Sequence, residues 1–265
     1  MAKKGILVIS FGTSYRETRE KTIEALEKAV TEKFKDYDVR RAFTSKMIIK
    51  KLKERDGIQV DYVDEALKKF LNDGIKDVMV MPTHIMNGTE FDFVAHYVAL
   101  FRDKFDNLRI STPLLSSEED YDDVVKAIDE SYVKRFFKDS SNGTAIVFMG
   151  HGTEHFANAT YSQLQLKLMA LGYEHIYVTT VEGFPTFDDT MRFMSGHKYN
   201  KVILAPFMLV AGDHALNDMA GDDEDSLKSK FISAGCDVEC IIEGLGEQKA
   251  FQDLFIKRLE RAINN

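Results

Sequence analysis

The sequence predicts an α/β protein of two similar lobes, in which parallel sheets carry helices on both faces. Short apolar runs alternate with amphipathic segments along the whole chain, which is typical of strands and helices in alternation. The second half also repeats the order of the first: residues 143–149 resemble residues 5–11, and residues 202–218 resemble residues 78–92. Such a repeat predicts two related lobes that face each other across a cleft.

The boundary between the lobes is predicted at the turn SSNG (140–143), where small and polar residues separate the two patterns. The expected N-terminal lobe is residues 1–139, and the expected C-terminal lobe is residues 140–265. Lobes of about 130 residues have an ordinary domain size.

Continuous apolar runs in the first half predict buried strands at residues 5–11, 39–44, 77–83 and 109–114. The first helix is expected to start with the capping box Ser14–Glu17. A second helix is expected to begin at Asp61 and to end at Gly74. Two more are expected at about 91–105 and 118–138, and the latter is acidic at its start and basic at its end, as the helix dipole favours.

The second half contains further apolar runs that predict strands within residues 143–149, 176–181 and 202–207. Another predicted strand lies between Cys236 and Cys240, the two cysteines of the chain. This placement does not resemble the disulfide framework of a secreted protein, so reduced thiols and a cytoplasmic location are the simpler interpretation.

Composition excludes several classes of partner. The chain has 265 residues, of which 44% are hydrophobic, so it can bury a sizeable core. A net charge of −8 argues against a nucleic-acid partner, although 35 lysines and arginines allow a local basic pocket for an acidic ligand. Because no apolar stretch reaches about 18 residues, no membrane span is predicted.

Three polar residues follow predicted strands of the second half: His151 in MGHGTEH, Glu182 in TVEGFP and His214 in AGDHALND. Their separations (182 − 151 = 31 and 214 − 182 = 32) each fit one strand–helix–strand step. Consecutive parallel strands deliver such side chains to the same carboxyl-end edge. Two imidazoles and a carboxylate form a mixed ligand set for a divalent transition metal. Either Asp213 or Asp218 could orient the second nitrogen of His214.

Other interpretations of these residues remain open. Any one of the three, taken alone, is more often a capped or core histidine or a solvated carboxylate. The string His151-Gly-Thr-Glu-His155 also fits the H-x-x-E-H pattern of inverted zinc peptidases. That chemistry requires a helix at 151–155, and the glycines on either side of His151 disfavour one.

A second group of polar residues follows the predicted strands of the first half. Ser10, Thr13 and Ser14 form a hydroxyl-rich strand end before a helix, which resembles an anion site. His84 occupies a corresponding loop, where it could line the same cleft or be a satisfied polar residue. The candidates for substrate binding are Ser10, Phe11, Thr13, His84 and Glu90. A nucleotide site is not expected, because neither GxxxxGK[ST] nor GxGxxG occurs.

Five motifs in order, ILVISFGTS, MPTHIMNGTEFD, MGHGTEH, TVEGFP and FMLVAGDHALNDMAG, resemble those of the anaerobic sirohydrochlorin cobalt chelatases of the class II chelatase superfamily. The resemblance covers essentially the whole chain. It implies two flavodoxin-like lobes with four-stranded parallel sheets and ATP-independent metal insertion into sirohydrochlorin in anaerobic cobalamin biosynthesis. It also implies that His151 is a metal ligand and the proton acceptor, and that Glu182 and His214 are the other ligands. Relatives of this kind handle several metals, so Co²⁺ is favoured over Fe²⁺ or Ni²⁺ only weakly.

This chemistry agrees with the residue types. Inserting a divalent metal into a tetrapyrrole removes two pyrrole N–H protons, which neutral imidazoles can accept near physiological pH. The expected partners are therefore sirohydrochlorin and a divalent metal, and a homo-oligomer is compatible with the sequence. The alternatives are a non-catalytic carrier of metal or tetrapyrrole, and a chelatase that uses Fe²⁺ or Ni²⁺ for sirohaem or a related tetrapyrrole.

Overall fold

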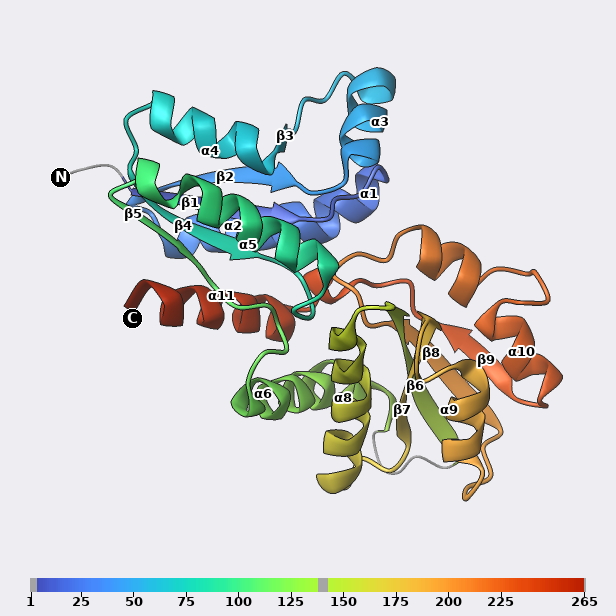
Figure 1. Cartoon of the computed structure of the whole chain (residues 1–265). Helices are drawn as coiled ribbons and strands as arrows, with labels where there is room; N and C mark the ends of the chain where they lie inside the picture. The colour runs from blue at the N-terminus through green and yellow to red at the C-terminus, as the bar shows by residue number, and fades with distance from the viewer. Residues whose placement is uncertain (1–3, 138–142, 265) are drawn as a thin grey trace. The chain divides into compact units, whose positions relative to one another are not determined.

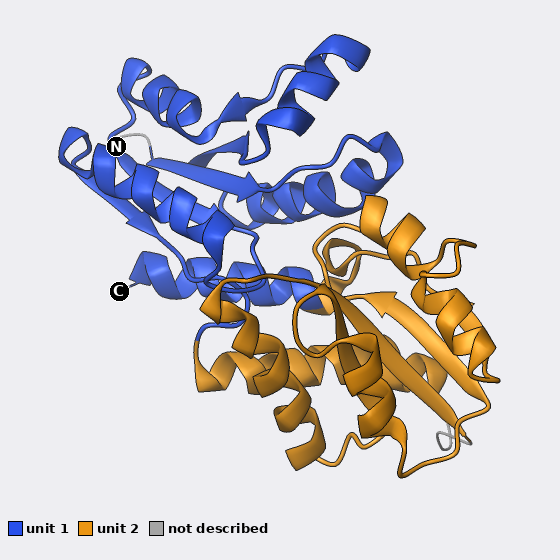
Figure 2. Cartoon of the chain, turned by 45° about the vertical axis from the view of Figure 1, so that its right-hand side comes forward, with its two compact units in different colours: residues 1–116, 251–265 blue, residues 117–250 orange. Residues whose placement is uncertain are grey.

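A computed structural model of the chain describes residues 4–137 and 143–264 and divides into two compact units. Unit 1 comprises residues 1–116 and 251–265, and unit 2 comprises residues 117–250 (Figure 2). This division differs from the expected boundary between residues 139 and 140, because the last helix of each half belongs with the other half. The expected turn at 140–143 lies almost wholly outside the described residues.

The C-terminal helix α11 (Lys249–Asn264) shows why the division differs. It buries Phe255 and Leu259, and its Arg258 Nε donates a hydrogen bond of 2.9 Å to the Leu114 carbonyl of unit 1. A salt bridge of 2.8 Å joins Lys33 and Glu260. The apolar face of this helix therefore completes the core of unit 1.

Unit 1 contains a five-stranded parallel sheet in the order β3-β2-β1-β4-β5 (Figure 1). Its strands are β1 (Lys4–Ser10), β2 (Tyr37–Phe43), β3 (Asp61–Tyr62), β4 (Asp77–Pro82) and β5 (Asn107–Ile110). The expectation of four strands was wrong for this unit. The additional strand is β3, which pairs only through Ala42↔Asp61 and Phe43↔Tyr62, and two residues are too few to leave a pattern in the sequence.

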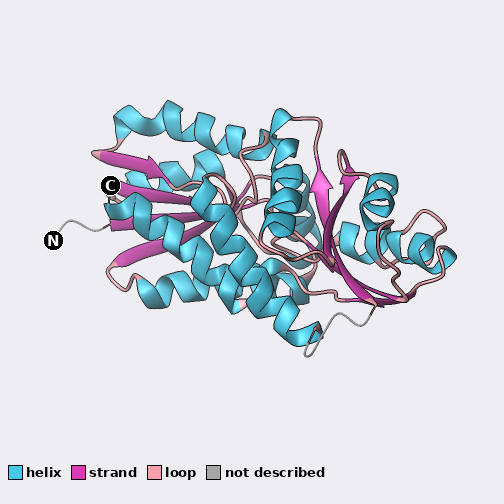
Figure 3. Ribbon diagram, turned by 90° about the horizontal axis from the view of Figure 1, so that it is seen from below, coloured by secondary structure: helices cyan, strands magenta, loops and turns pink. Residues whose placement is uncertain are grey.

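Helices lie on both sides of the sheet of unit 1 (Figure 3). They are α1 (Arg16–Arg19), η1 (Glu20–Glu24), α2 (Ala25–Lys33), α3 (Lys46–Asp56), α4 (Val63–Asn72), α5 (Thr89–Phe101), η2 (Arg102–Lys104) and α11, where η marks short π or 3₁₀ turns. Leu7 and Ile9 of β1 face a core formed with α4 and α5, which includes Leu67, Phe70 and Val98. Because side chains alternate along a strand, the residues between them supply the opposite face.

Two local features of unit 1 differ from the sequence prediction. Helix α3 was not predicted, since Leu52 is its only buried residue and no apolar stripe marks it. Its N-cap is Ser45, whose hydroxyl accepts from the Ile48 amide, and its C-cap is Gly57, with φ of 67°. The first helix begins at Arg16 without the expected capping box, because Tyr15 occupies the N-cap position.

Unit 2 contains a four-stranded parallel sheet in the order β7-β6-β8-β9, as expected. Its strands are β6 (Thr144–Gly152), β7 (Ile176–Glu182), β8 (Lys201–Pro206) and β9 (Asp237–Cys240). Its helices and turns are α6 (Glu118–Ile128), η3 (Asp129–Val133), α7 (Lys134–Phe136), η4 (Phe156–Asn158), α8 (Ala159–Ala170), α9 (Phe187–Met194), η5 (Ala215–Met219), α10 (Leu227–Ser233) and η6 (Leu245–Glu247). On one face Val147 and Leu204 pack with Phe231 of α10, and on the other Phe148 contacts Tyr132 at a centroid distance of 4.8 Å. Both cysteines are free thiols.

The two sheets share one strand order once the short β3 is set aside. In each unit the first strand is internal, with the second strand on one side and the third on the other. The chain therefore leaves the first strand in both directions, which makes a topological switch point at the carboxyl ends of the strands, where such folds bind ligands. In unit 2 the switch point lies between β6 and β8. Within the described part of the chain, no helix is both long and apolar enough to cross a lipid bilayer.

Candidate metal site

The three predicted metal ligands lie at the carboxyl-end edge of the sheet of unit 2. His151 is the penultimate residue of β6, and Glu182 is the last residue of β7. Gly152 and Glu182 are paired in the parallel ladder, so these two strand ends are neighbours. His214 is the N-cap of η5, in the segment that follows β8. His151 and Glu182 are exposed, whereas His214 is partly exposed, so all three are accessible to a ligand.

The imidazoles of His151 and His214 are brought together, with ring centroids 4.6 Å apart and planes at 89°. With metal–nitrogen bonds of about 2.1 Å, two imidazoles on one metal at ligand angles of about 90° to 110° have centroids roughly 4.5–5.2 Å apart. The observed separation falls within this range. Two histidines that are 63 residues apart in sequence (214 − 151) are thus close enough to share an ion.

Each of these rings is anchored through the same nitrogen. The Nδ1 atom of His151 lies 2.8 Å from the Gly152 carbonyl oxygen. The Nδ1 atom of His214 lies 2.6 Å from Oδ2 of Asp218, so of the two aspartates proposed for this task it is Asp218 that contacts the ring. When Nδ1–H donates to an oxygen, the proton is fixed there and Nε2 presents its lone pair, as in ligating histidines generally. Both rings are therefore prepared for coordination through Nε2.

The strand ends that carry His151 and Glu182 are connected by Asn158, which the sequence did not reveal. Its amide nitrogen donates to the Phe184 carbonyl at 2.7 Å, and its amide oxygen accepts from the Thr153 N–H at 3.1 Å. One side chain thus connects the segment after His151 with the segment after Glu182.

Close backbone approach requires glycine at position 152. Its φ of +81° favours glycine, and a Cβ atom there would lie 2.1 Å from the Glu182 carbonyl oxygen. No L side chain fits that space unless the strand end that carries Glu182 moves.

Tyr161 of α8 packs against β6, the strand that carries His151. It is 2% exposed, and a Cβ atom on Gly150 would lie 2.3 Å from its ring. Burial raises the pKa of Tyr161 to about 12, although hydrogen bonds from the backbone of Gly152 and His151 oppose this rise. The hydroxyl stays neutral and holds the backbone at the histidine. Neither Asn158 nor Tyr161 could be found from spacing, because both act through backbone atoms.

Glu182 completes the predicted ligand set only in part. Its backbone is placed beside His151, but no group of three or more His, Cys, Asp or Glu side chains within residues 4–137 and 143–264 is arranged to hold a metal ion. The structure therefore shows a pair of imidazoles beside a strand end that bears a carboxylate. Convergence of all three ligands on one ion stays a prediction.

The chain is similar to known proteins over nearly its whole length. A model of the family described as cobalt chelatase (CbiK) matches residues 4–264. The sirohydrochlorin cobaltochelatase of Salmonella typhimurium is 40% identical over 262 residues, which cover 99% of this chain and 97% of that protein. The chain belongs to the cobalt chelatase family.

Other relatives of this cobalt chelatase family member agree. The protein named sirohydrochlorin cobaltochelatase CbiKC from Nitratidesulfovibrio vulgaris is 31% identical over 266 residues, covering 100% of this chain and 92% of that protein. The structure of SirB from Bacillus subtilis with Fe³⁺ superposes with a TM-score of 0.65 at 12% identity, covering 99% of this chain and 96% of SirB. A sirohydrochlorin chelatase SirB in complex with cobalt, from Bacillus subtilis subspecies spizizenii, has a TM-score of 0.62 at 13% identity, covering 99% and 96%. The two structures share the chelatase fold with this chain.

The candidates for substrate binding lie in unit 1 and differ in accessibility. Ser10 and Thr13 are buried, and both hydroxyls are used within the protein: Ser10 Oγ accepts from Thr83 Oγ1 at 2.9 Å, and Thr13 Oγ1 accepts from the Tyr15 N–H at 3.2 Å. Phe11 is 47% exposed, and Glu90 is half-buried in the first turn of α5. Of these side chains, Phe11 offers the largest free surface.

His84 is a special case among these candidates. The residue as a whole is partly exposed, yet both ring nitrogens are inaccessible to solvent and have no hydrogen-bond partner. Burial lowers the pKa of His84 to about 4. The ring is therefore neutral at physiological pH and does not supply positive charge for a substrate carboxylate.

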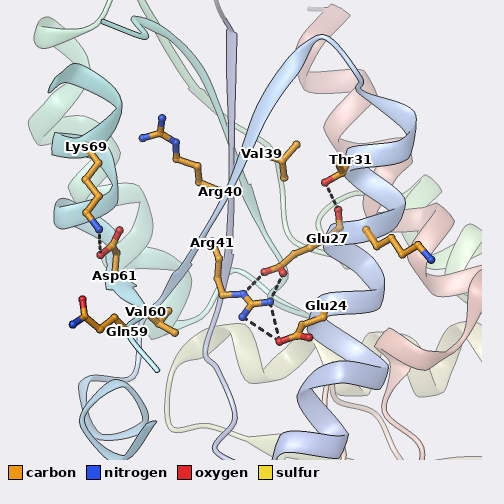
Figure 4. A pocket seen from close by; sticks show the side chains of 11 residues that line it. Glu24, Glu27, Thr31, Val39, Arg40, Arg41, Gln59, Val60, Asp61 and Lys69 are labelled. Carbon is orange, nitrogen blue, oxygen red and sulfur yellow. Dashed lines mark hydrogen bonds and ion pairs between the residues drawn. The ribbon is translucent and has the colours of Figure 1, made fainter. Parts of the chain in front are cut away.

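One charged pocket of unit 1 is not a substitute site. It has a volume of about 440 Å³ and lies between α2, β2 and the β3 region (Figure 4). Its guanidinium and ammonium groups are already paired, Arg41 with Glu24 and Glu27, Arg40 with Asp38 and Asp73, and Lys69 with Asp61. A pocket whose charges cancel internally offers little to an anionic ligand, and it contains no histidine.

Proposed function

We propose that this protein inserts Co²⁺ into sirohydrochlorin without ATP, as a cobaltochelatase of anaerobic cobalamin biosynthesis. The observation that carries the proposal is the pair His151 and His214, whose rings lie 4.6 Å apart and are each anchored through Nδ1. The relatives named sirohydrochlorin cobaltochelatase supply the substrate class.

The metal is the substrate held first. Nε2 of His151 and Nε2 of His214 bind Co²⁺, and the Glu182 carboxylate rotates towards them and offsets the charge of the ion. A set of neutral nitrogens and one carboxylate leaves coordination positions open, where pyrrole nitrogens replace water in turn. Without a thiolate ligand the ion is held loosely enough to leave; Cys236 precedes β9, and Cys240 is its last residue.

The proton balance of the reaction indicates a second role for His151, as a proton acceptor. Insertion replaces two pyrrole N–H protons of sirohydrochlorin by one Co²⁺, so two protons are released for each turnover. Once the ion has moved to the macrocycle, Nε2 of His151 is a free base at the place where the first proton leaves. The second proton passes to Glu182 or directly to water.

The predicted substrate-binding residues are Ser10, Phe11, Thr13, His84 and Glu90. We propose direct contact with the macrocycle for Phe11 and Glu90, whose side chains are not fully buried, whereas Ser10, Thr13 and His84 act through the local structure that they hold. Phe11 is the best placed of them, because its exposed ring can stack on a flat ligand. The interlobe cleft expected from the sequence, and a cytoplasmic location, stay predictions.

The choice of cobalt rests on the relatives rather than on the ligands. Affinity for nitrogen and oxygen donors rises from Fe²⁺ through Co²⁺ to Ni²⁺, so this site does not select cobalt by strength. The alternative of an Fe²⁺ or Ni²⁺ chelatase is tested by the same assay with each metal in turn.

The decisive experiment mixes trace protein, excess sirohydrochlorin and Co²⁺ anaerobically without nucleotide and follows the visible absorbance of the macrocycle. Many equivalents should be converted above the uncatalysed rate. The His151→Ala variant should fall towards that background, whereas His96→Ala, an exposed histidine of α5 in unit 1, should behave as wild type. Conversion that stops at one equivalent would instead identify a carrier.

A further inference from the structure

A second pair of histidines lies at the opposite edge of the sheet of unit 2. His175 immediately precedes β7, and His197 lies between α9 and β8. Their rings have centroids 5.1 Å apart and planes at 83°. Because β7 has seven residues and a strand rises about 3.3 Å per residue, this pair is roughly 20 Å along the strand from Glu182.

A chain of hydroxyl groups orients His175. Its Nδ1 atom lies 2.9 Å from the Tyr199 hydroxyl oxygen, which lies 2.7 Å from the Tyr177 hydroxyl oxygen. When Nδ1–H donates to Tyr199 and Tyr199 donates to Tyr177, the Tyr199 hydroxyl both accepts and donates a hydrogen bond. In that arrangement the proton is on Nδ1 and Nε2 of His175 keeps its lone pair, as in the His151 and His214 pair.

The two phenols serve as support and do not act as ligands. Burial raises the pKa of Tyr199 and of Tyr177, so both stay neutral at physiological pH. Burial, together with the neighbouring His197, lowers the pKa of His175, which keeps this imidazole in its neutral form.

We propose that His175 and His197 form a second, peripheral site for a divalent transition metal such as Co²⁺, Ni²⁺ or Zn²⁺. The ring centroids are 5.1 Å apart. This lies within the range of about 4.5–5.2 Å expected for two imidazoles on one ion, at an angle near tetrahedral. The neighbouring Glu174 acts electrostatically on His175 and adds negative charge beside the ion. Water completes the coordination.

Simple aromatic packing is the competing explanation for this cluster. It accounts for Tyr177 and Tyr199, which pack against the apolar core of unit 2. It does not account for His197, which is exposed and gains little from burial. Because the site lies at the other edge of the sheet, an ion held there is out of reach of a macrocycle at His151.

The test uses metal alone and no activity assay, so it is independent of the proposed function. Tag-free full-length protein with His151→Ala and His214→Ala is titrated with Ni²⁺ and with Co²⁺ by isothermal calorimetry. We expect one equivalent to bind in this background, and addition of His197→Ala should weaken that binding at least tenfold. His96→Ala, added in its place, is the matched control and should leave the binding unchanged.

A spectroscopic measurement adds geometry to the stoichiometry. Co²⁺ in the double variant should show the intense visible bands of a four-coordinate ion, and Tyr199→Phe should weaken binding because His175 loses its orienting hydroxyl. Absence of binding in the double variant, or binding that His197→Ala leaves unchanged, would overturn the proposal.

Discussion

The two sheets share one strand order, but the polar side chains at their carboxyl-end edges differ in accessibility. In unit 1 the hydroxyl of Ser10 is paired with Thr83, and the ring nitrogens of His84 are closed off from solvent. In unit 2 the rings of His151 and His214 remain accessible, and each uses only Nδ1 within the protein. The repeated fold therefore provides two equivalent switch points. The local hydrogen bonds determine at which of them imidazole nitrogens remain available to a ligand.

Loop length contributes to this difference. His84 follows Pro82, the end of β4, by two residues, whereas His214 follows Pro206, the end of β8, by eight. The longer segment of unit 2 forms the turn η5, which brings Asp218 onto the same side as His214, four residues away.

The largest effect is expected when a histidine at the edge of unit 2 is replaced and the result is compared with the same change in unit 1. His151→Ala should lower chelatase turnover by about 10²–10⁴, because in the proposed mechanism it removes both a metal ligand and the proton acceptor. His84→Ala should have a much smaller effect, since its nitrogens are not accessible. Steady-state rates of the two variants, measured side by side, test this difference. Similar losses in the two variants would show that the two strand ends do not differ in function.

The next effect concerns the backbone of the unit 2 edge. Gly152→Ala should destabilise the protein by more than the about 1–2 kcal/mol of a left-handed conformation alone, because its Cβ would meet the Glu182 carbonyl. Gly172→Ala is the matched control, since it has φ of +85° and nothing within 4 Å of its Cβ. Urea unfolding of both variants gives the comparison. Equal losses would show that the close approach of the two strand ends is unimportant.

The third effect uses pH to probe the unit 1 edge. The pKa of His84 is about 4 in the folded protein and near 6.5 when unfolded, so below pH 6.5 the unfolded state binds a proton that the folded state does not. Stability should therefore fall as the pH decreases from 6.5 towards 4, by up to about 3 kcal/mol from this group. His84→Leu should remove this part of the acid sensitivity. Urea unfolding at pH 7.5 and at pH 5 tests it, and an unchanged difference between the two pH values in the variant would show that His84 is not the cause.

The smallest effect tests the anchoring of His214. Asp218→Asn keeps the size of the side chain but removes its charge, so Nδ1–H is held less firmly and Co²⁺ affinity should fall by about 10–100-fold. The control is Asp222→Asn, because Asp222 pairs with Lys228 and contacts neither imidazole. Calorimetric titration with Co²⁺ distinguishes the two variants. Equal affinities would mean that the Asp218 contact does not prepare the ring.

Much of this molecule was predictable because its determinants are local or periodic. Continuous apolar runs mark β1, β4, β6 and β8, since a strand buried on both faces needs apolar residues throughout. The spacing of His151, Glu182 and His214 follows from the length of a strand–helix–strand step, so their common edge could be expected from sequence positions alone. Family membership followed from the motifs around the same strand ends.

Tertiary structure alone decided the features that depend on distant partners. Helix α11 joins unit 1 because its apolar face fits a core formed more than a hundred residues earlier, and no local pattern states which core a helix will cover. Asn158 and Tyr161 act on backbone atoms, which are the same in every residue and leave no trace in composition. The pairing of His175 with His197 likewise exists only because β7 and β8 are wound on either side of β6, so that two loops distant in sequence meet at one edge.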